Sequence, residues 1–337
     1  MTLDLKSLDN TTRLLFSVEL RPIQGDRFQP TGFPSLGAAT YQTSEGSKLL
    51  VESAQSMANR LETTCWDFAA NRPIAALDGI SHVTVMRKKK FLTDTMLEAH
   101  RLNSPYLLEN KDDTSFFDKL KADLGGLDKG PIDRKVFAEV LLRYDVGSLL
   151  HGVFLAKKDL AGGRLRVARV LSAFIEASGA RVAPSGGVKN DHVNPSGSTK
   201  DGFGNVPFAR DEFTAQSIVL HVNIDLAQVR GYGLGKPVES LLALLAMHRV
   251  RKLLDGDLRL RTACDFVLAT EGVIHSTRPD KFALPELGEL EAALKSFISE
   301  CKKLMQHETI AFDAELKSGK EEQASADDEA SDEADES

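Results

Sequence analysis

Two stretches of the chain alternate apolar and polar residues with the period of a strand that is buried on one face. In residues 16–21, FSVELR, every second residue is apolar, and residues 217–226, SIVLHVNIDL, repeat the pattern over a longer run. A period of two is typical of a half-buried strand. We therefore expect strands in both stretches, and a third at HVTVM, residues 82–86.

A helical period replaces this alternation near residues 47–63. At 100° per residue one side of the predicted helix is apolar, formed by Leu50, Ala54, Met57, Ala58 and Leu61. The other side carries small polar donors and one guanidinium, from Ser53, Ser56, Asn59 and Arg60. The pattern predicts a helix that is anchored by one face and free to bind by the other.

Further elements follow from the same periods and from glycine and proline. We expect helices near residues 114–124, 133–144, 237–254 and 286–306. SLLHGVFLA, 148–156, is interpreted as a buried strand, and LRLRTACDFVLAT, 258–270, as strand-like. Residues 162–180 fit both a strand and a helix, and a stripe of Leu165, Ala168, Leu171 and Ile175 favours the helix slightly.

A long segment at 183–208 holds five glycines and three prolines and few apolar anchors. Loops of this length inside a domain are usually functional or disordered. Strands separated by helices and long insertions indicate an α+β fold with an antiparallel sheet. We expect one module over residues 1–317, with a helical insertion at about 64–145, a thumb-like loop at about 183–208 and a disordered acidic tail at 318–337.

Charge and composition bound the function only loosely. Residues 321–337 hold nine of the 49 acids, so the first 320 residues carry 42 bases against 40 acids, a formal charge of +2. This balance neither requires nor forbids a polyanionic partner. Three scattered cysteines, without a CxxC spacing, argue against a disulfide framework or a cysteine zinc site. The longest apolar run, LLALLAM, is too short for a membrane span. We expect a cytoplasmic protein with no membrane partner, no metal and no cofactor.

Hydroxyl, amide and guanidinium donors of the kind on the helix at 47–63 hold phosphate oxygens without reading bases. The alternative interpretation is a solvated helix face. Likewise, the basic run at 87–90 is either solvent-exposed or a nucleic-acid contact, and the glycine-rich segment is either flexible or a finger that binds through Val188, Lys189, Asn190, His192 and Asn194.

Catalytic signals are weak. His151, His192 and His221 with Asp225 are the only candidates for a general base, and no HExxH, GxSxG or paired-carboxylate signature surrounds them. His151 fits a packed core residue better than a base. GYGLG, 231–235, lacks the full GxGxxG spacing and a trailing lysine, so it is interpreted as a turn rather than as a nucleotide loop.

Seven segments in order resemble the CRISPR-associated backbone proteins of the RAMP superfamily, most nearly the Cas-seven-type subunit of type I-G (earlier I-U) Cascade. They are GDRFQPTGFPSLGAATY, LLVESAQSMANRLE, SLLHGVFLA, SGGVKNDHVNPSG, GFGNVPFARDEFTA, VNIDLAQVRGYGLG and LRLRTACDF, within residues 13–272. ESAQSMANR is similar to the family's SSQSLKR-like helix start at Ser53, Gln55, Ser56 and Arg60. Asn59 replaces a lysine there.

The resemblance implies an RRM-like (ferredoxin-like) palm, a helical insertion and a thumb. It also implies a subunit that polymerises along a CRISPR RNA and helps a type I surveillance complex recognise target DNA. The expected RNA-binding residues are Arg21, Arg27, Ser53, Gln55, Ser56, Asn59 and Arg60, with the five finger residues named above. Expected partners are CRISPR RNA, target DNA, copies of the same chain, and the large and Cas-five/Cas-six-type Cascade subunits.

Such a subunit leaves bases free to pair with a target, and it is not an enzyme. The alternative is a RAMP-type metal-dependent RNA endonuclease in which Asp191 or Asp201 serves the metal.

Overall fold

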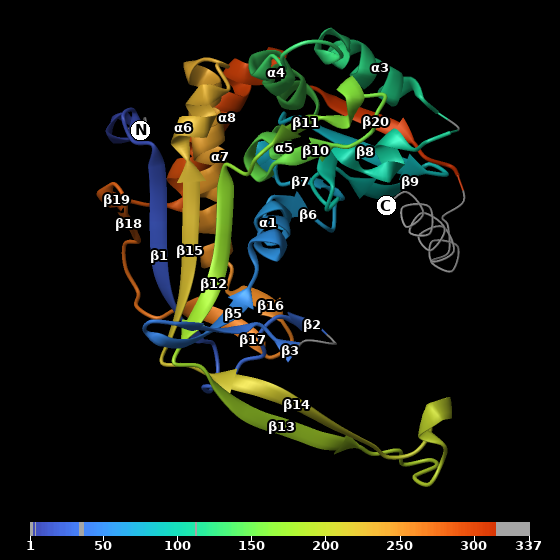
Figure 1. The fold of residues 1–337 in the computed structure, drawn as a ribbon, viewed down its shortest axis with the longest axis vertical. Helices are drawn as coiled ribbons and strands as arrows, with labels where there is room; N and C mark the ends of the chain where they lie inside the picture. The colour runs from blue at the N-terminus through green and yellow to red at the C-terminus, as the bar shows by residue number, and fades with distance from the viewer. Residues whose placement is uncertain (1–2, 4, 34–36, 112, 315–337) are drawn as a thin grey trace, which may run out of the picture.

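The computed structural model describes residues 3, 5–33, 37–111 and 113–314. Its centre is a seven-stranded sheet in which every neighbouring pair is antiparallel (Figure 1). In spatial order the strands are β16 (Leu258–Arg261), β17 (Cys264–Leu268), β1 (Arg13–Pro22), β15 (Ser217–Asp225), β12 (Leu171–Ser178), β5 (Gly46–Glu52) and β4 (Thr40–Thr43).

The alternating segments of the sequence form the middle of this sheet. β1 and β15 pair over eight positions, with Phe16 opposite Val222. The even-numbered residues from Leu14 to Leu20 and from Ile218 to Ile224 are buried, and the odd-numbered residues between them are more accessible. The strands predicted at 16–21 and 217–226 are therefore confirmed, and so is the one at 82–86, which lies within β8 (His82–Arg87).

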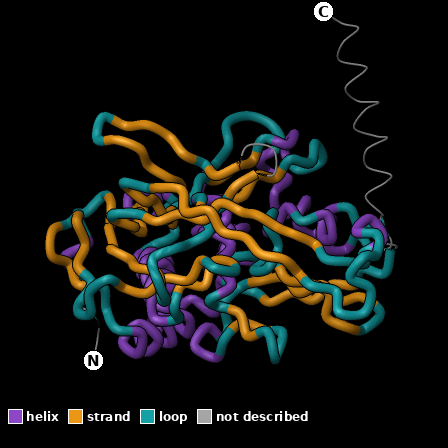
Figure 2. Tube along the Cα trace, turned by 90° about the horizontal axis from the view of Figure 1, so that it is seen from below, coloured by secondary structure: helices purple, strands orange, loops and turns teal. Residues whose placement is uncertain are grey.

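Helices cover the buried face of the sheet. α1 (Ala54–Thr63) packs on β12, while α7 (Lys236–Asp255) packs on β15 and on α8 (Leu287–Cys301). A short helix, α6 (Leu226–Gly231), joins β15 to α7. In the view from below, purple helices gather at the lower left, on one side of the orange strands (Figure 2). Along the chain these elements run β1, α1, β12, β15, α7, β17.

Three sequence predictions were wrong in part. The helix expected from residue 47 begins at Ala54, because Leu49 and Val51 are buried as alternate residues of β5. Residues 162–180 form no long helix. Leu165 belongs to β11 (Leu165–Val167), and the later apolar residues alternate along β12.

The third correction concerns SLLHGVFLA, predicted as one strand. Its first half is the helix α5 (Val146–His151), because Asp145 caps that helix by accepting a hydrogen bond from the backbone N–H of Gly147 at 3.1 Å. Gly152, with φ of +80°, ends the helix, and only then does β10 (Val153–Leu155) begin. A Cβ at Gly152 would lie 2.8 Å from the carbonyl oxygen of Val167, so the close approach of β10 to β11 requires glycine.

An insertion that contains both helices and strands separates α1 from β12. Its helices are α2 (Pro105–Leu108), α3 (Ser115–Leu124), α4 (Arg134–Tyr144) and α5, with 3-10 turns at Ala75–Leu77, Arg101–Asn103, Gly125–Leu127 and Ala161–Gly163. Its strands are β6 (Trp66–Asp67), β7 (Arg72–Pro73), β8, β9 (Lys90–Asp94), β10 and β11. The helices expected at 114–124 and 133–144 are confirmed as α3 and α4.

The end of the described chain returns to this insertion. β20 (His307–Ala311), which follows α8 and the 3-10 turn Lys302–Leu304, pairs in parallel with β8. The basic run at 87–90 forms the tight turn between β8 and β9, where Lys88 and Lys89 have positive φ. β18 (His275–Thr277) and β19 (Asp280–Ala283) form a separate hairpin beside β1.

The segment predicted as a thumb-like loop is largely a two-stranded hairpin. β13 (Arg181–Lys189) and β14 (Val206–Thr214) pair over nine positions and extend away from the body (Figure 1). Only the tip, residues 190–205, is irregular, with a single 3-10 turn at Thr199–Asp201. Near its base lie β2 (Gly32–Phe33) and β3 (Gly37–Ala38). We refer to β13, β14 and the tip as the thumb.

The acidic tail predicted to be disordered from residue 318 lies outside the described residues. Within the described part, none of the helices combines the length and apolar character that crossing a membrane requires.

Candidate nucleic-acid interface

The outer face of α1 is built by its cap. Ser53 has an extended backbone and precedes the first helical residue, and its side chain accepts a hydrogen bond from the backbone N–H of Ser56 at 3.3 Å. Met57 and Leu61 are fully buried, so the opposite side of the helix faces out. Gln55 and Asn59 are exposed there. The helix thus presents neutral amide donors to solvent. Of the four residues that helical spacing placed on the outer face, Asn59 is exposed, while Ser53, Ser56 and Arg60 are half-buried.

Arg60 occupies a different place from the one expected of a phosphate ligand. Its guanidinium donates to the carbonyl oxygens of Leu260 and of Arg259, the latter at 3.4 Å, and lies 3.5 Å from Glu52 Oε2. Glu52 is buried and also pairs with Arg261. Arg60 therefore ties α1 to β16 and to the end of β5, and its charge already has a carboxylate partner.

Glu52 and Arg261 were not singled out from the sequence. Glu52 is an acid placed directly before the helix cap, and its burial depends on Arg261, which is 209 residues away along the chain. Arg261 also donates to the carbonyl oxygens of Gln29 at 3.0 Å and Val51 at 3.3 Å. No local pattern signals contacts of this separation.

The loop after β1 connects the start of α1 to the base of the thumb. Phe28 and Phe213 exchange two backbone hydrogen bonds of 2.9 and 2.8 Å, and the N–H of Thr31 donates to Val51 O at 3.0 Å. Arg27, 58% exposed, lies 3.9 Å from Glu212 at that base. The structure thus brings Arg27 into one region with the cap of α1.

The remaining predicted residues lie further along the same elements. Arg21 is exposed near the end of β1, opposite Val267 of β17, and has no ion-pair partner among the described residues. The five finger residues, Val188, Lys189, Asn190, His192 and Asn194, are all exposed and lie at the far end of the thumb. The structure does not bring them to α1 of the same chain (Figure 1).

Asp191 shapes the tip of the thumb. Its carboxylate accepts hydrogen bonds from the backbone N–H groups of Val193, Asn194 and Gly204 at 2.9 to 3.0 Å. These bonds lower the pKa of Asp191. A carboxylate that is occupied in this way holds the tip together, which differs from the metal-binding role considered from the sequence.

The catalytic candidates are dispersed. His151 is buried in α5, His221 shares a 3.3 Å hydrogen bond with Ser17 on the sheet, and Asp225 caps α6 and pairs with Arg13 at 2.8 Å. Among the described residues no three His, Cys, Asp or Glu side chains gather as a metal site would require. GYGLG follows α6 as a turn with positive φ at Gly233 and Gly235.

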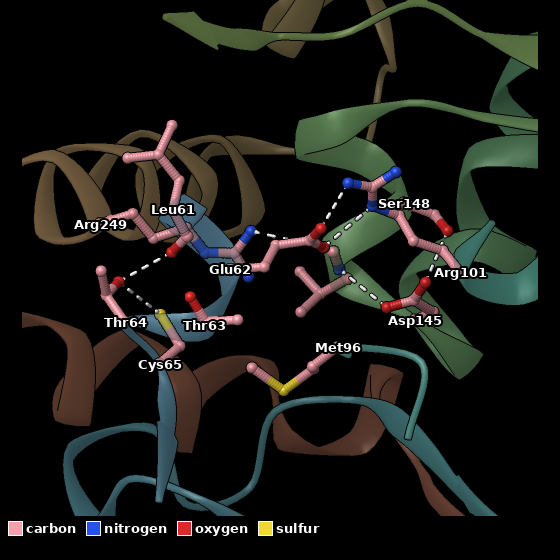
Figure 3. Close-up of polar contacts among 12 residues, drawn as sticks. Leu61, Glu62, Thr63, Thr64, Cys65, Met96, Arg101, Asp145, Ser148 and Arg249 are labelled. Carbon is pink, nitrogen blue, oxygen red and sulfur yellow. Dashed lines mark hydrogen bonds and ion pairs between the residues drawn. The ribbon is translucent and has the colours of Figure 1, made fainter. Parts of the chain in front are cut away.

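A buried ionic cluster fixes α1 to the insertion and to α7. Glu62 accepts two hydrogen bonds from Arg101, one of them 2.9 Å long from Nε, and lies 4.0 Å from Arg249 (Figure 3). Asp145 lies beside this group and accepts from Ser148 at 2.6 Å. Burial raises the pKa of Glu62 to about 7, against the two arginines, which lower it. The cluster holds the outer face of α1 in a fixed position.

The family model described as "CRISPR-associated protein GSU0053" matches residues 14–182, from the first strand of the sheet to the beginning of the thumb. No curated protein matches.

Two solved structures illustrate the more distant similarities. The first is described as "CRISPR RNA-guided surveillance complex, pre-nicking". One of its chains is 13% identical to this chain, with a TM-score of 0.37, and the match covers 71% of this chain and 68% of that chain. Csc2 of Thermofilum pendens is 8% identical, with a TM-score of 0.33, and the match covers 90% and 81%.

Proposed function

Because this chain belongs to the CRISPR-associated protein GSU0053 family, we propose that it is the CRISPR RNA-binding backbone subunit of a surveillance complex, of type I-G. The matched region, residues 14–182, spans half of the chain and includes α1 and the loop that joins it to the thumb. In this role many copies follow one guide RNA, and the chain binds RNA without cleaving it.

The order of the central elements supports an RRM-like palm. The chain runs β1, α1, β12, β15, α7, β17, while the spatial order is β17, β1, β15, β12 with antiparallel neighbours. A β-α-β-β-α-β path of this kind defines the ferredoxin-like fold. The thumb and the insertion are additions to that palm, and β5, β4 and β16 extend its sheet.

The observation that carries the proposal is the exposed donor face of α1 beside the loop of Arg27. Amide groups such as those of Gln55 and Asn59 donate to phosphate oxygens without distinguishing bases. Arg27 supplies charge, since its 3.9 Å contact with Glu212 leaves most of the side chain in solvent. A guide held by its backbone keeps its bases free for pairing with a target strand.

The thumb is the second part of the chain that supports this proposal. Its tip lies far from α1 of its own chain, so Lys189 and His192 contact the RNA segment or the surface of the next copy. Head-to-tail contacts of one kind, related by rotation and translation, generate a helical filament. The length of the guide then sets the number of copies, and the large and Cas-five/Cas-six-type subunits occupy the ends.

Coexpression with a CRISPR array tests the proposal. We expect the purified protein to carry RNA, seen as absorbance at 260 nm and as a discrete band after extraction. A Gln55→Ala/Asn59→Ala variant should carry less. Protein that is free of RNA at low salt, although its guide is present in the same cell, would contradict the proposal, and cleavage of a paired RNA target with Mg²⁺ would contradict its non-enzymatic part.

A further inference from the structure

A large basic cavity lies where the insertion meets the ends of the central strands β1 and β15, and none of its lining residues belongs to α1. Its volume is about 1470 Å³, and it is bordered by the start of β1, by α6, by the end of α5 and by the β10–β11 hairpin. Six arginines line it, from four separate parts of the chain: Arg13, Arg101, Arg134, Arg164, Arg166 and Arg169. Pockets for small ligands are typically about 300–1,000 Å³, so this volume suits a polymer better.

Three of these arginines are engaged within the protein. Arg101 pairs with Glu62, and Arg164 donates to the carbonyl oxygens of Leu127 at 2.8 Å and Gly130 at 3.0 Å. Arg13 pairs with Asp225, the one acid in the described lining. The cavity therefore has a positive charge that its own carboxylate does not balance.

The side chains of the other three, Arg134, Arg166 and Arg169, make no hydrogen bond or ion pair with any residue that the structure describes. Arg134 and Arg166 are exposed, and Arg169 is half-buried. Burial and the neighbouring charge of Arg101 lower the pKa of Arg169. Glu62, which is already paired with Arg101, opposes this shift, but no carboxylate among the described residues lies within ion-pair distance of Arg169. A partly buried cation in that position costs folding free energy, which a bound anion offsets.

His151 gives a second, independent sign of a ligand. Its side chain is 1% exposed and lines the cavity, yet neither ring nitrogen has a hydrogen-bond partner among the described residues. Its pKa is lowered by burial and by Arg249, Arg101 and Arg169, so the ring is neutral. A neutral imidazole offers one donor and one acceptor, and buried polar groups of native proteins are normally satisfied.

The β10–β11 hairpin adds an aromatic surface. Phe154 and Arg166 lie directly opposite each other across this hairpin, so their side chains share one face, and both line the cavity. Phe154 is 52% exposed, so its ring is accessible to a ligand. An exposed aromatic ring beside arginines is the combination with which proteins bind single strands, since bases stack on the ring and phosphates meet the cations.

We propose that this cavity binds a single-stranded nucleic acid, with phosphates on Arg134, Arg166 and Arg169, a base on Phe154, and a sugar or phosphate oxygen on His151. This inference rests on the proposed function, which indicates that the polyanion is a nucleic acid. It concerns a surface other than the outer face of α1. Guide RNA and target DNA share the phosphodiester chemistry, and the test separates them.

The test compares two pairs of charge removals in the full chain. Arg166→Ala/Arg169→Ala acts in the cavity, and Lys295→Ala/Lys302→Ala removes the same charge from exposed positions of α8 and the turn after it. Binding of short single-stranded RNA and DNA is followed by fluorescence anisotropy over a salt series. The cavity pair should lower the slope of log K against log salt by about 1.4, at 0.7 per lost phosphate contact, for at least one of the two strands. The strand affected identifies the source.

A slope equal to that of the control pair for both RNA and DNA would overturn the proposal. The same experiment with Gln55→Ala/Asn59→Ala keeps the two sites apart. If only this α1 variant weakens RNA binding, the proposed function stands and the cavity does not bind. If only the cavity pair does so, the cavity stands and the α1 site falls.

Two uncharged changes sharpen the result. Phe154→Ala should weaken binding roughly fivefold or more while the salt slope stays unchanged, because stacking involves no counterion release. His151→Leu should leave a folded protein whose Tm rises less on addition of the oligonucleotide than that of the wild type. An acidic peptide of residues 318–337 that binds more tightly than either strand, and depends on the same arginines, would overturn the assignment to nucleic acid.

Discussion

Arg60 Nη2 lies 3.5 Å from Glu52 Oε2, so the one arginine on the outer face of α1 is paired with a buried carboxylate. A residue type that suits phosphate binding is used here to join a helix to the preceding strand. The exposed amides of Gln55 and Asn59 remain available on the same face. This division separates structural from binding residues within one turn and a half of helix.

Arg60→Ala should therefore destabilise the fold by about 1–3 kcal/mol, because Glu52 and two carbonyl oxygens lose a charged donor. Urea unfolding measures this change. Arg259→Ala, which removes an 80% exposed side chain that lies 3.7 Å from Asp265, is the control and should alter the unfolding free energy by less than about 1 kcal/mol. An Arg60→Ala protein of wild-type stability that no longer binds RNA would assign Arg60 to the ligand instead.

Asn59→Lys tests the outer face by a gain of binding. Asn59 is exposed on α1, so a lysine there is free to reach a phosphate. RNA affinity should rise, and the slope of log K against log salt should steepen by about 0.7. The substitution Ser296→Lys, at an exposed position of α8, is the matched control for added charge. Equal effects of Asn59→Lys and Ser296→Lys would indicate general attraction rather than a site on α1.

The tip of the thumb should be removable. Lys189 and Val206 are the last paired residues of the hairpin, so an Asn-Gly turn can replace residues 190–205. The unfolding free energy of the body should change by less than about 0.5 kcal/mol, because the tip makes its hydrogen bonds within itself. Assembly along RNA, measured by sedimentation, should be impaired. Unchanged assembly would show that the tip makes no contact between copies.

The parts of the fold that the sequence predicted are those with a strong local period. β1 and β15 alternate cleanly, and the burial of Met57 and Leu61 follows from helical spacing. The stretch that contains β12 was compatible with both strand and helix, because Leu165, which belongs to another strand, completed an apparent helical stripe with Leu171. The period within Leu171–Ser178 alone was that of a strand.

The sequence predicted which side chains of the candidate site face outward, but not which partners they contact. Outward orientation of Gln55 and Asn59 follows from the helix, but the engagement of Arg60 depends on Leu260, 200 residues away. The basic cavity combines Arg134 with Arg166 through the packing of the insertion. Such pairs arise from long-range topology, which no window of the sequence contains.

Glu62→Gln should be among the most destabilising single changes. It removes the carboxylate that Arg101 and Arg249 share in a fully buried cluster (Figure 3), and breaking a buried pair costs about 3–5 kcal/mol. Chemical denaturation measures the loss. A Glu62→Gln/Arg101→Met double variant should recover part of it, since one unpaired charge is removed as well. Additive losses would show that the two side chains do not interact.

His248 should make the fold sensitive to acid. Its side chain is fully buried on α7, 3.6 Å from Glu291, and burial together with Lys252 and Arg249 lowers its pKa from 6.5 to about 4. Between these values the unfolded chain binds a proton that the folded chain does not, so stability falls as the pH decreases from 6.5 to 4, by up to about 3 kcal/mol. Glu62, whose pKa is raised to about 7, contributes in the opposite direction in the same window. His248→Leu isolates the histidine because Glu62 is common to both proteins: urea unfolding at a series of pH values should show a smaller loss on acidification in the variant, and parallel curves would contradict the assignment.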